Sequence, residues 1–296
     1  MTLRRFPRPR LVRRVGARRG AARLTARPTA RLAARPALCL ALVVGGCADG
    51  PPERGPATAE PPLGAAGAAG ADAAALRAAL SSAMATNRTL PYDAAWTVLP
   101  EAHAAGPGRI RLFYTRAVVP AADRAAGDDQ AEPDHWNREH LWPQSYGLRD
   151  TPARTDLHNL VPADRTVNSS RGRKFYDEVS GPHHECAGCE VSRDAWEPPA
   201  ELKGDVARAA FYMDVRYEGA AGDGVGDLSL SDDPDADARR FGALSTLIDW
   251  HCTDPVSAEE GRRHEAAARA QGNRNAFVDA PELAERVYGF ECTGGR

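Results

Sequence analysis

The chain has 296 residues, 43% of them hydrophobic and 26% charged, and a formal net charge of −2. This length allows one large domain or two small ones, with a substantial core. The charge is unevenly distributed, because residues 1–46 hold 12 arginines and no acidic residue, and the chain from Cys47 onward carries −14. Such an acidic protein repels phosphate at long range, which argues against nucleic acid binding unless basic charge is concentrated locally.

The N-terminal segment has the pattern of an export signal. Residues 1–36 are rich in Arg and Ala, and an apolar run of eight residues follows at 37–44, too short to span a bilayer but typical of a signal peptide core. The ending Gly45-Gly46-Cys47 resembles a bacterial lipoprotein cleavage box, with Cys47 as the lipidated residue. We therefore predict an export signal of the lipoprotein type at 1–46 and a membrane contact through the lipid. The expected location is the cell envelope, at the outer membrane or in the periplasm. Ordinary secretion and a transit peptide are the alternatives.

The remainder divides into a tether and a folded domain. Residues 47–72 are rich in Pro, Gly and Ala and cannot bury an apolar face, so they are predicted to be a flexible tether. Residues 73–296 are predicted to form one mainly helical α+β domain. The expected helices span 73–86, 92–99, 203–217, 241–250, 257–270 and 281–288, and residues 271–279 are expected to be a loop. Alternation in 109–114 predicts a half-buried strand.

Two of these helices carry more specific expectations. Val206, Ala210, Met213 and Tyr217 fall on one face of the helix at 203–217, which predicts an amphipathic helix. The helix at 257–270 begins with an S-x-x-E capping box, from Ser257 to Glu260.

The most informative stretch runs from Asn137 to Lys174. Its pieces at 137–145 and 156–162 are predicted to be short strands, because β-branched and aromatic residues lie between Pro and Gly. Asn168 and the two serines after it are plausible caps for a helix through Phe175 and Val179. From Arg138 to Lys174 seven basic residues face four acidic ones, a local charge of +3. Basic charge is therefore concentrated where a phosphate would need it.

Three residues of this stretch suit phosphodiester hydrolysis, which needs a base for the water and a cation at the phosphate. His140 is the natural base, since its ordinary pKa is close to neutrality. Glu139 and Asn168 supply the hard oxygens that Mg²⁺ prefers. Neighbouring residues of a regular strand point to opposite faces, so Glu139 and His140 can serve one site only if the strand ends or bulges there. We therefore expect irregular backbone at 139–140.

The second predicted strand brings three further polar residues near the site. Asp156 and His158 lie two apart and are expected to share a face, while Asn159 points towards the loop after His140. For His158 two roles are equally consistent with the sequence: support of the catalytic residues, or packing in the core.

The segments Arg138-Glu139-His140, Asp156-Leu157-His158-Asn159-Leu160 and Val167-Asn168-Ser169 closely resemble the bacterial endonuclease I family of ββα-metal (HNH-like) nucleases. The resemblance extends over about 76–288 and includes later blocks at 203–208, 250–256 and 271–275. It implies a helical domain around a small ββα-metal motif, acting as a monomeric, exported, Mg²⁺-dependent endonuclease on DNA or RNA with little sequence preference. Mn²⁺ and Ca²⁺ are alternative ions.

The same resemblance assigns roles to individual residues. It makes His140 the general base and Glu139 and Asn168 the metal ligands, and it makes Asn159 the brace of the loop that carries the base. Family members often carry an Arg before the second strand that stabilises the leaving group, for which Arg149 and Arg154 are both available. The remaining candidate phosphate contacts are Arg138, Arg171, Arg173 and Lys174, with Arg171 best placed after Asn168.

Four cysteines remain if Cys39 and Cys47 belong to export. In an exported chain they more often form two disulfides than a zinc site, and we favour Cys186–Cys189 with Cys252–Cys292 among the three possible pairings. His183 and His184 beside the CxxC keep a zinc or redox module as an alternative function. A further alternative is a non-catalytic surface protein that binds DNA, although the charge of −14 and the intact His140 argue against it.

Overall fold

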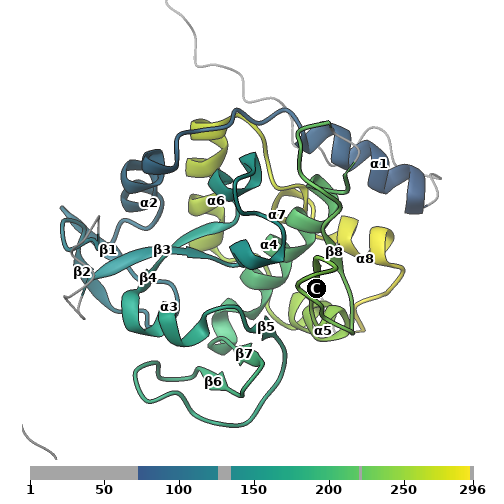
Figure 1. Cartoon of the computed structure of the whole chain (residues 1–296). Helices are drawn as coiled ribbons and strands as arrows, with labels where there is room; N and C mark the ends of the chain where they lie inside the picture. Colours follow the sequence, from purple (N-terminus) through teal and green to yellow (C-terminus); the bar gives the residue numbers. More distant parts are fainter. Residues whose placement is uncertain (1–72, 126–134, 220–221, 294–296) are drawn as a thin grey trace, which may run out of the picture. The chain divides into compact units, whose positions relative to one another are not determined.

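The computed structural model describes residues 73–125, 135–219 and 222–293, so the predicted export signal and tether lie outside the described residues. The described part is an α+β domain, as predicted, in which helices surround several small sheets (Figure 1). No helix among the described residues is long and apolar enough to cross a membrane.

The helices agree with the sequence prediction at most positions. They are α1 (Ala73–Met84), α2 (Ala95–Ala102), α3 (Arg165–Arg171), α4 (Lys203–Arg216), α5 (Leu244–Thr253), α6 (Ala258–Gln271), α7 (Ala276–Asp279) and α8 (Glu282–Tyr288). The described residues also contain four 3₁₀ turns, η1 (Tyr92–Ala94), η2 (Gln144–Tyr146), η3 (Pro152–Thr155) and η4 (Ala200–Leu202). The short helix α7 replaces part of the loop predicted at 271–279, because the Asn275 side chain caps it by accepting the N–H of Phe277.

The strands form small separate sheets. An antiparallel pair joins β1 (Arg109–Arg111) to β2 (Val118–Pro120), and a second joins β3 (Trp136–His140) to β4 (Leu160–Asp164). In the third sheet β7 (Ala195–Glu197) lies between β5 (Phe175–Tyr176), which is parallel to it, and β6 (Glu190–Val191), which is antiparallel. The parallel strands β8 (Ser229–Leu230) and β9 (Arg240–Phe241) complete the set.

Helix α4 is the centre of the domain, and the prediction that it is amphipathic is wrong. Every residue from Gly204 to Arg216 is buried, because α1, α5 and α7 all pack against this helix. Its charged side chains are paired inside the protein: Arg208 donates to Glu260, and Asp214 accepts from Arg77. Helix α4 can therefore be buried on all sides, because its buried charges have partners of opposite sign.

The predicted capping box of α6 is half right. The Ser257 side chain accepts the backbone N–H of Glu260, as the motif requires. The Glu260 carboxylate instead binds the buried guanidinium of Arg208, at 2.6 and 2.8 Å. Tertiary pairing with α4 has thus displaced the local bond that the sequence predicts.

Candidate active site

Two strands and a helix follow one another at the centre of the predicted site. Strands β3 and β4 pair in regular register, with Glu139 opposite Val161 and His140 opposite Leu160. Helix α3 begins directly after β4, because the Asp164 side chain accepts the N–H groups of Thr166 and Val167. The order strand, strand, helix matches the prediction, although the helix begins earlier than expected.

Three predictions about this stretch are wrong in detail. The strand pairing is regular through Glu139 and His140, so no irregular backbone is found there, but β3 ends at His140, which is the other condition under which both residues can serve one site. Asn168 lies inside α3 and does not cap it, since Asp164 is the cap. The helix does not run through Phe175, because Gly172 has a φ of 56° and ends it, and Phe175 enters β5. Only glycine adopts such a conformation readily.

Asn168 and Glu139 face the same side of the strand pair. The Asn168 amide donates to the Asn137 side chain at 2.7 Å and to the carbonyl of Arg138 at 3.4 Å. Residues two apart on a strand point the same way, so Asn137 and Glu139 both face α3. Among the described residues, no hydrogen bond to the side-chain oxygen of Asn168 is found, which leaves that oxygen available to a ligand.

The Glu139 carboxylate is held by a buried network. Its side chain is 4% exposed, and it accepts a hydrogen bond from the Tyr114 hydroxyl at 3.0 Å while the Arg171 guanidinium lies 3.2 Å away. The Tyr114 hydroxyl also bonds that of Tyr176, at 2.6 Å. Burial raises the pKa of Glu139, and Arg171 and Tyr114 oppose that rise because both favour the charged form.

His140 is positioned as a neutral imidazole. Its Nε2 lies 2.9 Å from the carbonyl of Arg154, which only accepts, so Nε2 carries the proton and Nδ1 keeps its lone pair. Nδ1 accepts a hydrogen bond from the Gln144 side-chain amide at 3.3 Å, and the ring stacks on Tyr92 with centroids 5.8 Å apart. Burial, helped by the charges of Arg154, Arg138 and Arg171, lowers the pKa of His140 to about 4, although the bond to the carbonyl of Arg154 acts in the opposite direction.

Asn159 braces the turn after His140, as predicted. Its side-chain oxygen accepts the N–H of Trp142 at 2.7 Å, and its amide donates to the carbonyl of Trp142 at 3.1 Å. Its backbone carbonyl accepts the N–H of Leu141 at 3.0 Å. These bonds fix the chain that leaves the base, so Asn159 acts on His140 through the backbone.

Arg171, predicted to contact a phosphate, is bonded inside the protein. Its guanidinium is fully buried and donates to the carbonyls of His140, at 2.8 Å, and Leu141, at 2.5 Å. The same group contacts Glu139, so Arg171 holds together the two residues expected to carry the chemistry. It is a positioning residue.

Asp156 and His158 are not on a strand, because residues 156–159 form a turn before β4. The buried Asp156 carboxylate accepts from Tyr212 at 2.6 Å, Tyr217 at 2.9 Å and Gln271 at 2.8 Å. His158 lies 3.2 Å from the carbonyl of Asn273. Asp156 therefore joins the turn to α4 and α6, and the half-buried His158 packs against the rings of Tyr212 and His264.

Comparisons with known proteins identify the family of this chain. The model of the family described as Endonuclease I matches residues 73–282. The chain belongs to the endonuclease I family. It is 40% identical over 227 residues to a Bacillus amyloliquefaciens protein named extracellular ribonuclease, covering 75% of this chain and 76% of that protein. A Bacillus subtilis (strain 168) protein of the same name is 36% identical over 228 residues, covering 75% of this chain and 77% of that protein.

More distant relatives carry other names. An Aeromonas hydrophila protein named extracellular deoxyribonuclease is 26% identical over 129 residues, which is 42% of this chain and 49% of that protein. A Buchnera aphidicola protein named Endonuclease-1 is 28% identical over 128 residues, 42% of this chain and 44% of that protein.

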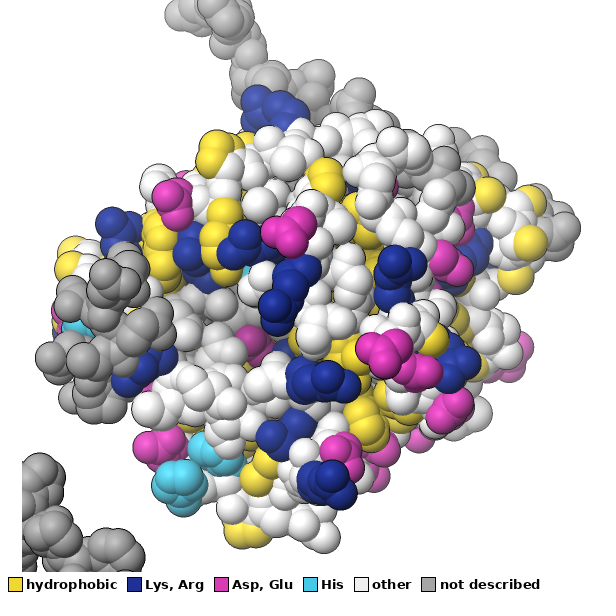
Figure 2. Space-filling view, viewed as in Figure 1, with side chains coloured by type: hydrophobic (Ala, Val, Ile, Leu, Met, Phe, Trp, Pro, Cys, Tyr) yellow, Lys and Arg dark blue, Asp and Glu magenta, His cyan; other side chains and the backbone are white. Residues whose placement is uncertain are grey.

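Apart from Arg171 and the exposed Arg149, the predicted phosphate contacts of this endonuclease I family member lie in two places. Arg138 and Arg154 lie over the ring of Tyr92, beside His140. Arg173 and Lys174 line an open, polar hollow together with Arg193 and Arg240, whereas Arg149 is simply exposed. Figure 2 shows dark blue side chains gathered across the middle of this face. The predicted phosphate contacts are therefore distributed on both sides of the strand pair.

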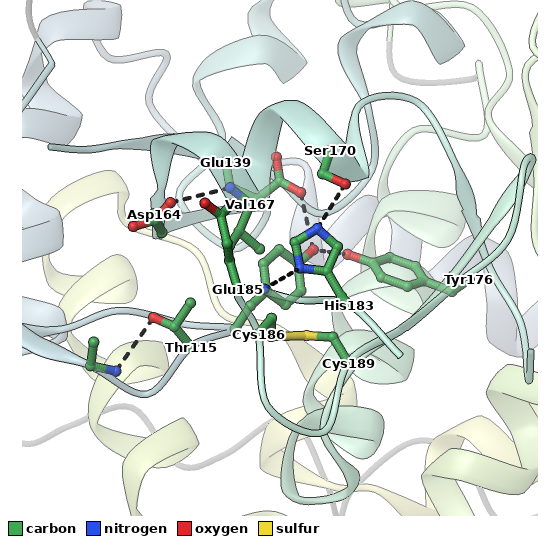
Figure 3. Close-up of a disulfide and its surroundings, with 12 residues drawn as sticks. Thr115, Glu139, Asp164, Val167, Ser170, Tyr176, His183, Glu185, Cys186 and Cys189 are labelled. Atoms are coloured by element: carbon green, nitrogen blue, oxygen red, sulfur yellow. Dashed lines mark hydrogen bonds between the residues drawn. A yellow bond between two sulfur atoms is a disulfide. The ribbon is translucent and has the colours of Figure 1, made fainter. Parts of the chain in front are cut away.

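The cysteine prediction is confirmed. Disulfides join Cys186 to Cys189 and Cys252 to Cys292, which excludes a four-thiolate zinc site. Figure 3 shows the first disulfide below His183, whose Nε2 lies 2.8 Å from the Ser170 hydroxyl on α3. Because His183 Nδ1 accepts the N–H of Glu185, Nε2 carries the proton and donates to Ser170. The CxxC loop is thus fastened to α3, close to the labelled Glu139.

The site fits a hard cation with few protein ligands. The described residues contain no group of three or more His, Cys, Asp or Glu side chains that could hold a metal. Mg²⁺ needs no such group, because it keeps several waters and takes one or two protein oxygens plus substrate phosphate. Glu139 and Asn168 offer those oxygens on one side of β3.

Sequence reasoning missed the aromatic residues of the site. Tyr114 donates to Glu139 and is itself bonded to the Tyr176 hydroxyl, and Tyr92 stacks on His140. The half-buried strand predicted at 109–114 ends at Arg111, and Leu112, Phe113 and Tyr114 are all buried. Nothing local in the sequence indicates that Tyr114 has a partner 25 residues away.

Proposed function

We propose that this protein is an exported, metal-dependent endonuclease that hydrolyses phosphodiester bonds of DNA and RNA. Membership of the endonuclease I family and relatives named as nucleases support the reaction class. The observation that carries the catalytic assignment is the fixed imidazole of His140. The carbonyl of Arg154 holds its Nε2–H, which leaves the Nδ1 lone pair for a proton.

In this proposal His140 is the general base. Its Nδ1 takes a proton from the attacking water, and the imidazolium so formed is stabilised because Nε2–H already donates to the carbonyl of Arg154. Gln144, 3.3 Å from Nδ1, marks the place that the water would take. Arg171 and Asn159 keep the base in position through the carbonyls and N–H groups around it.

Glu139 and Asn168 would hold Mg²⁺, with Mn²⁺ and Ca²⁺ as alternatives. A bound cation there supplies positive charge to the phosphate and to the leaving oxygen. Tyr114 and Arg171 orient the Glu139 carboxylate for this role. Between the two arginines considered for the leaving group, Arg154 is favoured, because it lies over Tyr92 beside His140, whereas Arg149 is exposed.

The substrate assignment rests on the names of the relatives. The two relatives that cover three-quarters of this chain are named ribonucleases, and a deoxyribonuclease matches over a shorter part. We therefore include RNA together with DNA. Relatives named as extracellular and periplasmic support export. Lipid anchoring at Cys47 is a separate part of the proposal that rests on the sequence of residues 37–47.

The test is cleavage of plasmid DNA and of single-stranded RNA with and without a chelator. Chelation should stop both reactions, and added Mg²⁺ should restore them. His140→Ala should lower turnover by about 10²–10⁴-fold, the usual effect of losing a general base. The matched control is His184→Ala, whose side chain is 82% exposed and which should keep full activity. Full activity of His140→Ala would contradict the assignment.

A further inference from the structure

Arginine and aromatic side chains alternate in one stack beside the site. The guanidinium carbons of Arg154 and Arg138 lie 4.1 and 3.5 Å from the ring centroid of Tyr92. Arg138 also lies 4.1 Å from the ring centroid of Trp96, over which Arg124 lies at 5.4 Å. We call this set the arginine ladder: Arg154, Tyr92, Arg138, Trp96 and Arg124. Figure 2 shows yellow and dark blue side chains alternating in a row on the upper left of this face, beside α2.

The fold holds the ladder in place at several points. Trp96 packs edge-on against the buried Trp136 of β3, with centroids 5.2 Å apart. Arg138 donates to the carbonyl of Tyr92 at 2.8 Å. A backbone bridge joins Arg124 to Trp136. These anchors keep long side chains ordered before any ligand arrives, which lowers the entropic cost of binding.

The ladder concentrates positive charge with little compensation. Arg138 and Arg154 share the Tyr92 ring, so their charges are less than about 8 Å apart and repel each other. Among the described residues, one carboxylate pairs with the three guanidinium groups, that of Asp93, at 3.3 Å from Arg138 and 87% exposed. From Cys47 onward the chain carries −14, so such a local excess is unusual for it. A bound polyanion would relieve the repulsion.

One end of the ladder is at the proposed base. Tyr92 stacks on His140, and the backbone carbonyl of Arg154 holds its Nε2. The other end is Arg124, an exposed residue before β3 that sequence reasoning did not single out. The ladder therefore leads from the proposed base, His140, to the surface beside α2.

We propose that the arginine ladder binds successive phosphates of a nucleic acid strand on one side of the scissile bond. This inference rests on the proposed function, since the strand is that of the substrate. The guanidinium groups contact the backbone and not the base edges, so binding is independent of sequence. The rings hold the guanidinium planes in a fixed orientation, and a base of the strand can stack against the exposed end.

Binding of a fluorescent single-stranded oligonucleotide of about 16 nucleotides tests the ladder. It is measured in the His140→Ala background, where turnover is suppressed, over a series of salt concentrations. Each phosphate contact adds about 0.7 to the slope of log Kd against log salt for a single strand. Arg124→Gln should therefore weaken binding and make the slope shallower by about 0.7. The matched control is Arg262→Gln, an exposed arginine of α6 outside the ladder, which should change neither quantity.

A second pair of variants tests the rings. Trp96→Leu should weaken binding by about two- to fivefold, because two guanidinium groups lose their cation–π partner. Trp96→Phe keeps a ring and should restore most of the affinity. An unchanged salt slope for Arg124→Gln, or equal effects of Leu and Phe at position 96, would overturn the ladder. Rapid degradation of the oligonucleotide in the His140→Ala background would contradict the proposed base instead, so the two failures are distinguishable.

Discussion

One backbone carbonyl decides which nitrogen of His140 is available for chemistry. Without the carbonyl of Arg154 either ring nitrogen could carry the proton, and only a fraction of the molecules would have the tautomer with an unprotonated Nδ1. The bond to Nε2 at 2.9 Å fixes the tautomer that leaves Nδ1 unprotonated. Burial keeps the ring neutral as well, since it lowers the pKa of His140 to about 4.

Asn168 provides a prediction that separates metal binding from proton transfer. Asn168→Ala removes a neutral oxygen ligand, so the Mg²⁺ concentration for half-maximal rate should rise by about 10–100-fold. Saturating Mg²⁺ should then restore part of the rate, and it should not restore His140→Ala. Titrations of cleavage rate against Mg²⁺ measure both effects.

Ser169→Ala is the control for that titration, because Ser169 is the next residue of α3 and is exposed. It should leave the Mg²⁺ requirement unchanged. The roles assigned to the two residues are wrong if excess Mg²⁺ rescues His140→Ala or has no effect on Asn168→Ala.

His158 gives a prediction about stability and pH. Burial lowers its folded pKa to about 4, whereas an unfolded histidine titrates near pH 6.5. Between these values the unfolded chain binds more protons, so the free energy of unfolding should fall as the pH drops from about 6.5 to about 4. Above pH 6.5 the contribution is complete. His140 contributes in the same direction.

Urea unfolding at a series of pH values measures this effect. His158→Gln should reduce the proton uptake on unfolding by close to one proton in that window, since glutamine can still donate to the carbonyl of Asn273. His184→Ala, at an exposed histidine, should leave the pH dependence as it is. An identical dependence in wild type and His158→Gln would contradict the buried neutral state.

At the scale of single elements, helix α3 shows how a short segment serves several residues of the site. It is seven residues long, yet Asn168 faces β3, Arg171 reaches the carbonyls after His140, and Ser170 accepts from His183. Asp164 starts the helix and Gly172 ends it, so its length is set by two local signals. A longer helix through Phe175 would have removed β5 from its sheet.

The disulfide between Cys252 and Cys292 should stabilise the domain more than the other one. It joins α5 to the segment after α8 and closes a loop with a sequence separation of 40. Cross-linking restricts the unfolded chain, which in the chain-entropy model contributes about 3–4 kcal/mol for such a loop. Replacing both cysteines by serine should lower the free energy of unfolding by that order and leave turnover nearly unchanged.

The Cys186–Cys189 pair supplies the comparison, because its sequence separation is 3 and it restricts the unfolded chain less. Replacing Cys186 and Cys189 by serine should lower the free energy of unfolding, measured with urea, by less than replacing Cys252 and Cys292. The CxxC loop is fastened to α3 through His183 and Ser170. Loss of the Cys186–Cys189 disulfide should therefore lower activity more than loss of the Cys252–Cys292 disulfide. Equal stability losses for the two double variants would contradict the loop-length argument.

At the scale of the whole molecule, charge is divided between the site and the rest. The stretch from Arg138 to Lys174 carries +3 within a chain that carries −14 from Cys47 onward. Acidic surface elsewhere repels a polyanion, so a nucleic acid should approach by the basic face. Activity on long substrates should therefore decrease as salt screens this attraction.

The proposed anchor is tested in whole cells. Cys47→Ser removes the residue expected to carry the lipid, so the protein should leave the membrane fraction or remain unprocessed, and a fatty-acid probe should no longer label it. Cys39→Ser, inside the apolar run, is the matched control and should keep both properties. Membrane association that survives Cys47→Ser would contradict lipidation.

The sequence by itself determined the family, the α+β class, most helices and the residues proposed for chemistry. Those signals are local: Glu139 and His140 are adjacent, helical spacing repeats every three to four residues, and Ser257 caps a helix that begins beside it. The two disulfides are the pairing favoured from the sequence, among three that four cysteines allow.

Only the tertiary structure decided how these residues act together. Tyr114 is 25 residues from the Glu139 that it binds, and Arg138 lies 46 residues from the Tyr92 carbonyl that it meets. The buried place of Arg171 and the burial of α4 on all sides depend on the packing of several elements at once. Such contacts form between chain segments that no local pattern joins, so side-chain partners and burial follow from the folded arrangement and not from residue spacing.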